Sequence, residues 1–473
     1  MRKTKIICTI GPSSESEEKL HDLIMAGMNV ARFNFSHGTH AEHEAKFLRL
    51  RKIRINMNLP IATLLDTKGP EIRLRDFKDH KVTLVRGQQF TLTTREVVGD
   101  ENQVTISYKD LPKDVRKGTH ILIDDGLIGL VVGEVTDTDI ICTVENGGPV
   151  SDKKGVNVPD AELSMPFISE QDRSDIEFGC KLGFDYIACS FTRTAQDIRD
   201  VRKILDAHGS KMKVIAKIES TQGINNIEEI LDEVDGVMVA RGDMGVEVPL
   251  EDVPIYQKKI ISMAQKKAKI VITATQMLDS MIHNPRPTRA ETADVANAIY
   301  DGTTAIMLSG ETAAGAYPVE AVKTMAKIAE RAEKEIDYRS RRHELLLHDG
   351  VAHTSTTAIC HASTNVADEI GAKAIIAVTI SGFTATRLSR LRPTVPIIAC
   401  TTNVRVACQM NLLFGVVPLI IGMEENADAL FERAVRMAKL TGLITEGDTV
   451  IITAGVPLGS SGNTNLIRVV DVD

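Results

Sequence analysis

The chain has 473 residues, which is too long for one ordinary domain and indicates two to four. Its hydrophobic fraction of 43% and charged fraction of 25% are typical of a globular protein in water. A formal net charge of −8 argues against a nucleic-acid partner or an anionic membrane surface. The sequence also lacks an apolar run of the roughly 18 residues that a membrane helix needs, so we expect no membrane partner.

The cysteines and the N-terminus predict a cytoplasmic location. Seven cysteines without a CxxC pair do not form a disulfide framework and are typical of reduced thiols. The first residues, MRKTKIICTIGP, contain an apolar segment that is too short for a signal peptide.

Short apolar strands alternate with helix-length segments over the first two thirds of the chain. Three strands precede a break in this alternation, and five follow it. The predicted strands are Lys5–Ile10, Asn29–Phe35, Pro60–Asp66, Phe184–Phe191, Lys213–Glu219, Gly236–Ala240, Ile270–Thr275 and Ala305–Ser309. Eight strand–helix units predict an α/β fold with a (β/α)8 TIM barrel.

Two further regions interrupt or follow this barrel pattern. Residues 70–166 contain short strand-like runs bounded by turns, such as VTLV and DIICTV, and predict an inserted all-β domain. After a charged connector at Tyr338–His348, alternation resumes and predicts an α/β domain around a mainly parallel sheet. We therefore expect a barrel domain at 1–69 and 167–345, an insert at 70–166 and a C-terminal domain at 346–473.

The most informative stretch is Val214–Glu219, an apolar run interrupted by two charged residues. Alternate side chains of a strand share a face, so Lys217 and Glu219 point the same way. Such residues are rarely buried unless they are paired or functional. A buried ion pair is the plainer alternative, although such pairs stabilise proteins little.

Other polar residues follow the remaining barrel strands, where barrel enzymes carry their catalytic groups. Arg32, Asn34 and Ser36 share one face of the second strand. Each residue alone has a plainer explanation, such as a rim salt bridge or a turn cap, but their joint placement favours a site. The further candidates at the strand ends are Asp66, Thr67, Asp243, Thr275 and Ser309.

The candidate groups suggest a particular chemistry. Mg2+ is commonly held by one or two carboxylates and substrate oxygens, a role that Glu219 and Asp243 could fill. Lys217 and Arg32 beside such a metal would clamp a transferring phosphoryl group. The segment Gly242–Gly245 is expected to be a turn whose N–H groups receive a carboxylate. The residues alone thus predict metal-assisted chemistry on a phosphorylated carboxylic acid.

Longer motifs resemble those of the pyruvate kinase family, in the family's order and over essentially the whole chain. They are KIICTIGP (Lys5–Pro12), NFSHG (Asn34–Gly38), LDTKGPEIR (Leu65–Arg73), KKGVNVP (Lys153–Pro159), AKIES (Ala216–Ser220), MVARGDMG (Met238–Gly245), ATQMLDSM (Ala274–Met281), NPRPTRAE (Asn284–Glu291) and MLSGETA (Met307–Ala313). The resemblance implies phosphoryl transfer from phosphoenolpyruvate to ADP, giving pyruvate and ATP in the final step of glycolysis. Because the chain ends at Asp473, it is similar to bacterial members without an extra C-terminal domain.

The resemblance implies a role for each residue of the barrel mouth. Lys217 stabilises the phosphoryl group in transit and the enolate, and Arg32 grips the phosphoryl group. Thr275, with Ser309 through water, is the candidate route for protonating the enolate. The residues expected to bind phosphoenolpyruvate are Arg32, Lys217, Gly242, Asp243 and Thr275.

Nucleotide and metal contacts are implied in the same way. ADP would contact Asn34, His37, Arg73 and Lys154. The insert would then close as a lid and exclude water. The divalent metal, Mg2+ or Mn2+, would bind Glu219 and Asp243.

A potassium ion is also implied. Its ligands would be Asn34, Ser36, Asp66 and Thr67. Because Asp66 and Thr67 are adjacent in a strand and face opposite ways, Thr67 should offer its carbonyl oxygen rather than its hydroxyl. In this family a glutamate at the position of Glu71 goes with potassium dependence, so a K+-requiring enzyme is expected.

The C-terminal domain resembles the family's regulatory domain. Its segment TISGFT lies between a strand and a helix and suits a phosphate at a helix N-terminus, although a plain turn is the alternative. The second wall of this effector pocket would be the loop Gly459–Asn465. The expected effector contacts are Thr379, Ser381, Gly382 and Thr384.

The effector itself is expected to be a monophosphate. Members activated by fructose 1,6-bisphosphate carry an arginine near Ala429–Phe431, where this chain reads ALF. AMP or ribose 5-phosphate is therefore favoured. The resemblance also implies a homotetramer.

Two other functions are compatible with parts of this pattern. A metal-dependent barrel lyase or aldolase acting on a phosphorylated or keto acid would use Lys217 and the carboxylate pair, but would not need Arg73, Lys154 or a lid. A non-catalytic sugar-phosphate sensor would use only the C-terminal pocket.

Overall fold

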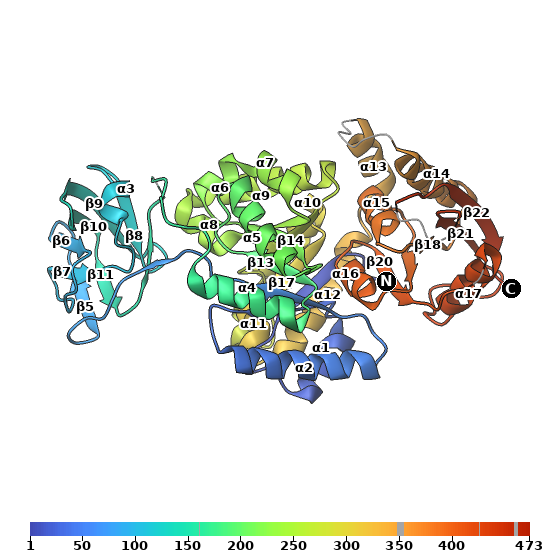
Figure 1. Ribbon diagram of the computed structural model, residues 1–473, viewed down its shortest axis with the longest axis horizontal. Coiled ribbons are helices and arrows are strands. Elements are labelled where there is room, and N and C mark those ends of the chain that lie inside the picture. The colour runs from blue at the N-terminus through green and yellow to red at the C-terminus, as the bar shows by residue number, and fades with distance from the viewer. Residues whose placement is uncertain (160, 348–353, 425, 458–461) are drawn as a thin grey trace.

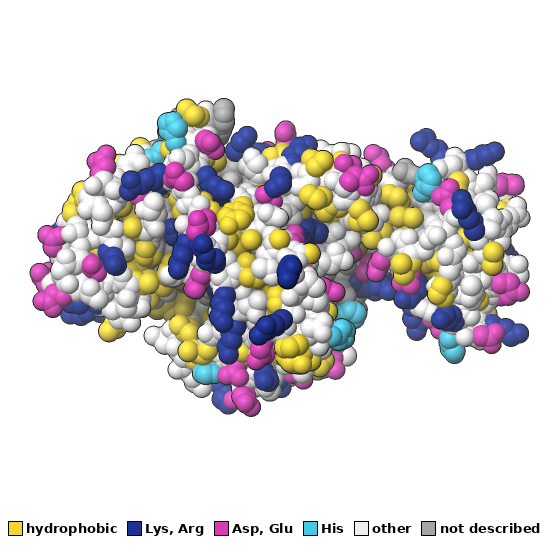
Figure 2. All heavy atoms as spheres, turned by 180° about the vertical axis from the view of Figure 1, so that it is seen from behind, with side chains coloured by type: hydrophobic (Ala, Val, Ile, Leu, Met, Phe, Trp, Pro, Cys, Tyr) yellow, Lys and Arg dark blue, Asp and Glu magenta, His cyan; other side chains and the backbone are white. Residues whose placement is uncertain are grey.

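The structure is a computed structural model that describes residues 1–159, 161–347, 354–424, 426–457 and 462–473. Three bodies lie in a row, with the barrel in the middle, the β insert on one side and the C-terminal domain on the other (Figure 1). On the face seen in Figure 2, acidic and basic side chains are interspersed. None of the helices in the described part of the chain combines the length and apolar character that crossing a membrane requires.

Eight parallel strands form the predicted closed barrel, so the expected TIM-barrel fold is confirmed. The order around the barrel is β1-β17-β16-β15-β14-β13-β3-β2. Each strand matches a predicted one, and all but β15 are shorter than predicted by one or more residues. The strands are β1 (Lys5–Thr9), β2 (Val30–Asn34), β3 (Ala62–Asp66), β13 (Tyr186–Cys189), β14 (Lys213–Ile218), β15 (Gly236–Ala240), β16 (Ile270–Ala274) and β17 (Ala305–Leu308).

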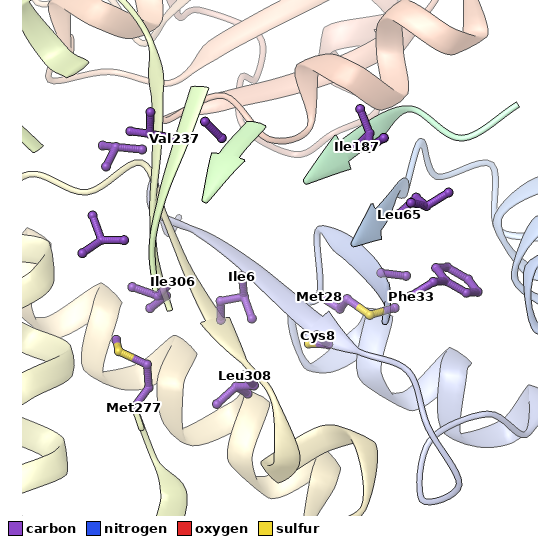
Figure 3. Close-up of a cluster of buried hydrophobic side chains, with 14 of the residues drawn as sticks. Ile6, Cys8, Met28, Phe33, Leu65, Ile187, Val237, Met277, Ile306 and Leu308 are labelled. Atoms are coloured by element: carbon purple, nitrogen blue, oxygen red, sulfur yellow. The ribbon is translucent and has the colours of Figure 1, made fainter. Parts of the chain in front are cut away.

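Helices surround the barrel because the outward-facing side chains of its strands are apolar. Ile6 and Cys8 of β1 belong to the outer core between strands and helices, whereas Ile7 belongs to the inner core. Figure 3 shows Ile6 and Cys8 in the outer core with Ile306 and Leu308 of β17. The main outer helices are α1 (Glu17–Ala26), α2 (His40–Asn56), α4 (Glu170–Leu182), α5 (Ala195–Ala207), α7 (Ile227–Glu233), α9 (Val253–Lys266), α10 (Arg289–Asp301) and α12 (Pro318–Glu333).

The insert after β3 is built from strands around its own apolar core, which includes Phe90 and Leu130. Seven strands form one sheet in the order β4-β12-β8-β9-β10-β6-β7, and β11 pairs with β5. These strands are β4 (Ile72–Arg73), β5 (Lys81–Leu84), β6 (Gln89–Thr93), β7 (Gln103–Thr105), β8 (His120–Ile123), β9 (Ile128–Val135), β10 (Asp139–Asn146), β11 (Gly148–Ser151) and β12 (Gly155–Asn157). The insert both leaves and rejoins the barrel on the side where the parallel strands end.

The C-terminal domain contains the expected mainly parallel sheet. Its order is β20-β19-β18-β21-β22, and only β22 runs antiparallel to its neighbour. Helix α13 (Tyr338–Leu347) occupies most of the predicted connector. The strands are β18 (Ala374–Val378), β19 (Ile397–Thr401), β20 (Val416–Ile420), β21 (Thr449–Ala454) and β22 (Leu466–Asp471), and the helices are α14 (Ser355–Ile370), α15 (Phe383–Leu391), α16 (Val404–Met410) and α17 (Ala427–Lys439).

Candidate active site

Lys217 lies at the centre of a cluster of charged side chains inside the barrel. Its ammonium is 2.9 Å from Glu219 Oε1 and 3.3 Å from Asp66 Oδ1. It also donates a hydrogen bond of 2.7 Å to Ser190 Oγ. The ammonium thus donates to one hydroxyl and forms ion pairs with two carboxylates. The predicted common face of Lys217 and Glu219 is therefore present, and the two also form a salt bridge.

Arg32 and Asp66 form the second part of the cluster. Arg32 Nε lies 2.6 Å from Asp66 Oδ2, and an Arg32 NH donates to Thr9 Oγ1 at 2.9 Å. Burial by itself raises the pKa of Asp66, but Arg32 and Lys217 outweigh it and hold that pKa below its ordinary value. For Lys217, burial acts to lower the pKa, and Asp66 and Glu219 raise it overall. The site thus keeps the Lys217 ammonium and the Asp66 carboxylate charged.

Glu219 is fully buried directly after β14. Its Oε2 accepts a hydrogen bond of 2.6 Å from the backbone N–H of Phe191, whereas Oε1 has the Lys217 ion pair but no hydrogen bond. Burial and the nearby Asp243 raise the pKa of Glu219 to about 8, against the opposing effect of Lys217. A buried carboxylate of this kind is costly unless a cation compensates it.

These features fit a divalent cation. Glu219 Oε1 accepts no hydrogen bond and could therefore coordinate a cation, and Asp243 is close enough to raise the pKa of Glu219. Among the described residues, no cluster of three or more histidine, cysteine or acidic side chains could hold a metal by itself. A metal at this site would therefore take two carboxylates from the protein and its remaining oxygens from substrate and water, as Mg2+ commonly does.

The RGD segment after β15 differs from the expected turn. Arg241–Glu247 forms helix α8, so Gly242–Gly245 lies within a helix. Because β15 ends at Ala240 and the helix starts at the next residue, the backbone N–H groups of its first turn remain free for other acceptors. One of these, the N–H of Gly242, donates to Thr275 Oγ1 at 2.8 Å.

Thr275 has an unusual backbone conformation. Its φ of +68° is rare for a β-branched residue, and an Arg241 NH donates to its carbonyl at 2.8 Å. This places the Thr275 hydroxyl against Gly242. The other proposed proton-route residue, Ser309, precedes the short helix α11 (Gly310–Ala313), and its N–H donates to Glu311 at 2.7 Å.

A cleft of about 320 Å³ separates the insert from the barrel mouth. Arg73 and Lys154 line it on the insert side, and Asp243 lines it on the barrel side. Arg73 pairs with Glu71 at 2.8 Å, and Lys154 pairs with Asp124 at 2.8 Å. Two of the four predicted nucleotide contacts thus share a cleft with a predicted metal ligand.

The other two nucleotide candidates come from the loop after β2 and do not line this cleft. Asn34 Oδ1 accepts the backbone N–H of Ser36 at 3.1 Å, and the His37 N–H approaches the Asn34 carbonyl at 3.4 Å. The His37 carbonyl contacts buried His43 Nε2 at 2.9 Å. The compact loop keeps Asn34 beside Asp66, its direct neighbour in the pairing of β2 with β3.

Sequence reasoning assigned no candidate to the fourth barrel strand, yet two residues that contact the charged cluster follow it. Ser190 contacts Lys217, and Phe191 contacts Glu219. Phe191 also has a positive φ of +53°, which is strained for a large side chain. Their position at the C-terminal end of a barrel strand was the available signal, but a serine followed by a phenylalanine carries no charge to draw attention.

A second cavity, of about 310 Å³, lies in the C-terminal domain. Thr379 and Thr384 line it, and Thr384 Oγ1 lies 2.6 Å from Thr464 Oγ1. Gly382 precedes α15, and its N–H donates to Thr379 Oγ1 at 3.1 Å. Ser381 and Gly382 are not lining residues, and part of the predicted loop Gly459–Asn465 lies outside the described residues.

The closed barrel and its cluster of facing cations and carboxylates define a barrel enzyme that handles an anionic group. A family model described as "Pyruvate kinase, barrel domain" matches residues 1–322, and one described as "Pyruvate kinase, alpha/beta domain" matches residues 357–470. The chain belongs to the pyruvate kinase family.

Individual relatives support this placement. The chain is 47% identical over 471 residues to a pyruvate kinase from Clostridium perfringens, covering 99% of each protein. It is 48% identical over 473 residues to one from Staphylococcus aureus, covering 99% of this chain and 80% of that protein. A crystal structure of a pyruvate kinase from Cryptosporidium parvum superposes with a TM-score of 0.96 at 38% identity, covering 100% of this chain and 96% of that one.

Proposed function

We propose that this protein transfers the phosphoryl group of phosphoenolpyruvate to ADP and forms pyruvate and ATP. The main supporting observation is the Lys217 ammonium, which is held by three oxygens beside a second cation, Arg32, at the mouth of the barrel. Phosphoryl transfer depends mainly on positioning and on cations that match the charge of the equatorial oxygens. Membership of the pyruvate kinase family selects phosphoenolpyruvate and ADP as the substrates.

Lys217 and Arg32 would bind the phosphoryl group from two sides. Both are fixed to Asp66, through distances of 3.3 Å and 2.6 Å, so their charges are in place before substrate arrives. Glu219 and Asp243 would hold Mg2+ or Mn2+, which supplies additional positive charge to the phosphate oxygens when bound.

The substrate carboxylate would lie at the start of α8. The N–H groups of Gly242 and Asp243 belong to its first turn, and the Gly242 N–H already donates to the Thr275 hydroxyl. Thr275 would therefore contact the same end of the substrate. With Ser309, it is our candidate for delivering the proton to the enolate.

The nucleotide would occupy the cleft between insert and barrel. Arg73 and Lys154 would bind its phosphates, since each is paired with only one carboxylate and lines the cleft. Asn34 and His37 would contact it from the β2 loop. An insert that covers this cleft would also exclude water, which otherwise competes with ADP for the phosphoryl group.

A potassium ion would bind Asn34, Ser36, Asp66 and the carbonyl oxygen of Thr67. The Thr67 hydroxyl accepts the N–H of Ser190 at 3.1 Å. Its side chain is therefore engaged with the neighbouring strand, which supports the carbonyl as the ligand. Glu71, at the start of the insert, pairs with Arg73, and on the family pattern it implies a requirement for K+.

The C-terminal cavity would bind an activating phosphate near Thr379, Ser381, Gly382 and Thr384. None of its described lining residues is a lysine or an arginine, which favours a monophosphate such as AMP or ribose 5-phosphate over a bisphosphate. On the resemblance alone we also propose a homotetramer. A cytoplasmic location is proposed because all seven cysteines are free thiols, six of them buried and Cys180 half-buried.

A lactate dehydrogenase-coupled assay tests the main proposal. The purified protein with phosphoenolpyruvate, ADP, Mg2+ and K+ should form pyruvate and ATP in equal amounts, and Lys217→Met should not. A wild-type protein that forms no ADP-dependent pyruvate would favour the lyase or aldolase alternative, and pyruvate that forms without ADP would indicate only hydrolysis of phosphoenolpyruvate. A protein that binds sugar phosphates but has no turnover would point to a sensor.

A further inference from the structure

Ser190 connects parts of the active site that come from two other barrel strands. It follows β13, is 2% exposed and carries its hydroxyl between β3 and β14. The oxygen accepts from Lys217 Nζ at 2.7 Å. It also lies 2.6 Å from the Thr67 carbonyl oxygen and 3.2 Å from Asp66 Oδ1.

The direction of these hydrogen bonds follows from the donors available. Lysine can only donate, and a serine hydroxyl has one proton. The Ser190 oxygen must therefore accept from Lys217, and its single proton is directed to one of two acceptors. The Thr67 carbonyl is the nearer of the two by 0.6 Å. The result is a chain of donors that runs from Lys217 through Ser190 to the Thr67 carbonyl.

The backbone around Ser190 holds this hydroxyl in place. Its own N–H donates to Thr67 Oγ1 at 3.1 Å, and the N–H of Phe191 donates to Glu219 at 2.6 Å. A Cβ atom added at Gly69 would lie 2.8 Å from Ser190 Cβ, so the backbone just before the insert packs directly on this residue. The hydroxyl has little freedom to leave its position.

We propose that Ser190 is a positioning residue that orients the Lys217 ammonium and links it to the monovalent cation site. This inference rests on the proposed function, in which Asp66 and the Thr67 carbonyl are potassium ligands. Both of these groups contact Ser190 Oγ. When K+ orders Asp66 and the Thr67 carbonyl, their fixed positions therefore also fix the Ser190 hydroxyl, which in turn orients Lys217.

A direct route between the cation site and Lys217 also exists, through the 3.3 Å contact with Asp66. A bound K+ would compete for that carboxylate and repel the ammonium. The neutral Ser190 hydroxyl is not weakened in the same way. With K+ bound, it becomes the firmer of the two anchors, so its removal should affect the enzyme most strongly in K+.

The test is steady-state kinetics of Ser190→Ala in K+ and in Na+. A hydrogen bond to a charged group is worth about 10- to 100-fold in rate, so kcat in K+ should fall by that factor. The KM for phosphoenolpyruvate should change little. The ratio of kcat in K+ to kcat in Na+ should fall toward one. That ratio is independent of the fraction of folded enzyme, because both rates come from one preparation.

Thr192→Val is the matched control, because Thr192 lies in the same loop and its buried hydroxyl donates only to the Cys189 carbonyl, at 2.9 Å. It should retain the wild-type ratio. Ser190→Cys serves if the alanine variant fails to fold, since a thiol of similar size is a weak donor and acceptor. It should give an intermediate ratio.

Several results would overturn the proposal. They are an unchanged K+ to Na+ ratio in Ser190→Ala, a wild-type ratio in Ser190→Cys, or an equal loss in Thr192→Val. Failure of the proposed function has a different signature, because the wild-type protein itself would then form no ADP-dependent pyruvate.

Discussion

Removal of the Lys217 charge should separate its catalytic role from its structural one. In Lys217→Met the ammonium is lost, so Glu219, which is 0% exposed, has no ion-pair partner of this kind wherever it is ionised. Loss of one partner of a buried pair costs about 3–5 kcal/mol. We therefore expect the variant to lose turnover and also to unfold at lower denaturant concentration than the wild type.

The pH dependence of this loss has a defined sign. Burial and Asp243 already raise the pKa of Glu219 to about 8, and Lys217 opposes that rise. Without Lys217 the folded-state pKa must be higher still. A carboxyl group whose pKa is higher in the folded than in the unfolded state lowers the free energy of unfolding by its full amount only above the folded-state pKa. This destabilisation disappears below the unfolded-state pKa of about 4.3. The variant should thus recover stability as the pH falls from 9 toward 5.

The double variant Lys217→Met with Glu219→Gln gives the decisive comparison. It removes both charges, so the unfolding midpoint should return most of the way to the wild-type value while turnover stays absent. Midpoints from urea titrations followed by circular dichroism, together with the coupled assay, measure both quantities. A single variant as stable as the wild type at pH 8, or a double variant that regains activity, would refute this reasoning.

Three further results are expected. Glu219→Gln should weaken the Mg2+ dependence as well as the rate, and loss of rate alone would argue against a ligand role. In the wild type a proton on Glu219 should compete with the metal, so the Mg2+ affinity measured by calorimetry should fall below pH 8. Replacement of K+ by Na+ should collapse the rate in the coupled assay, whereas equal rates would contradict the interpretation of Glu71. AMP or ribose 5-phosphate should lower the KM for phosphoenolpyruvate more than fructose 1,6-bisphosphate does, and the reverse ranking would exclude a monophosphate preference. Thr384→Val should abolish this effect with basal kcat unchanged.

Much of the architecture was accessible from the sequence because it depends on local periodicity. Burial on both faces produces short apolar strands, and the eight strand–helix units between Lys5 and Glu333 could be counted directly. The common face of Lys217 and Glu219 follows from the two-residue repeat of a strand. The strand ends predicted too long, such as Phe184–Phe191 against Tyr186–Cys189, reflect hydrogen bonding, which apolar patterns do not report.

The limits of sequence reasoning lie in contacts between strands. The sequence predicts a turn at Gly242–Gly245, but these residues lie within helix α8, because glycines and an aspartate at the end of a strand suit either. Lys154 and Asp243 line one cleft only because the insert folds back over the barrel. The domain boundaries and the residue roles assigned by resemblance remain predictions.

The chain by itself determined which residues face the inside of the barrel and which strand ends carry charge, since both follow from the period of a strand and the order of the motifs. Only the tertiary structure decided how those charges are connected. Ser190 meets Lys217, Asp66 and Thr67 because closure of the barrel places β13 between β3 and β14. A hydroxyl acquires its role from the polar atoms it contacts, here within 3.2 Å, and these partners are set by the packing of the strands rather than by neighbours in the sequence.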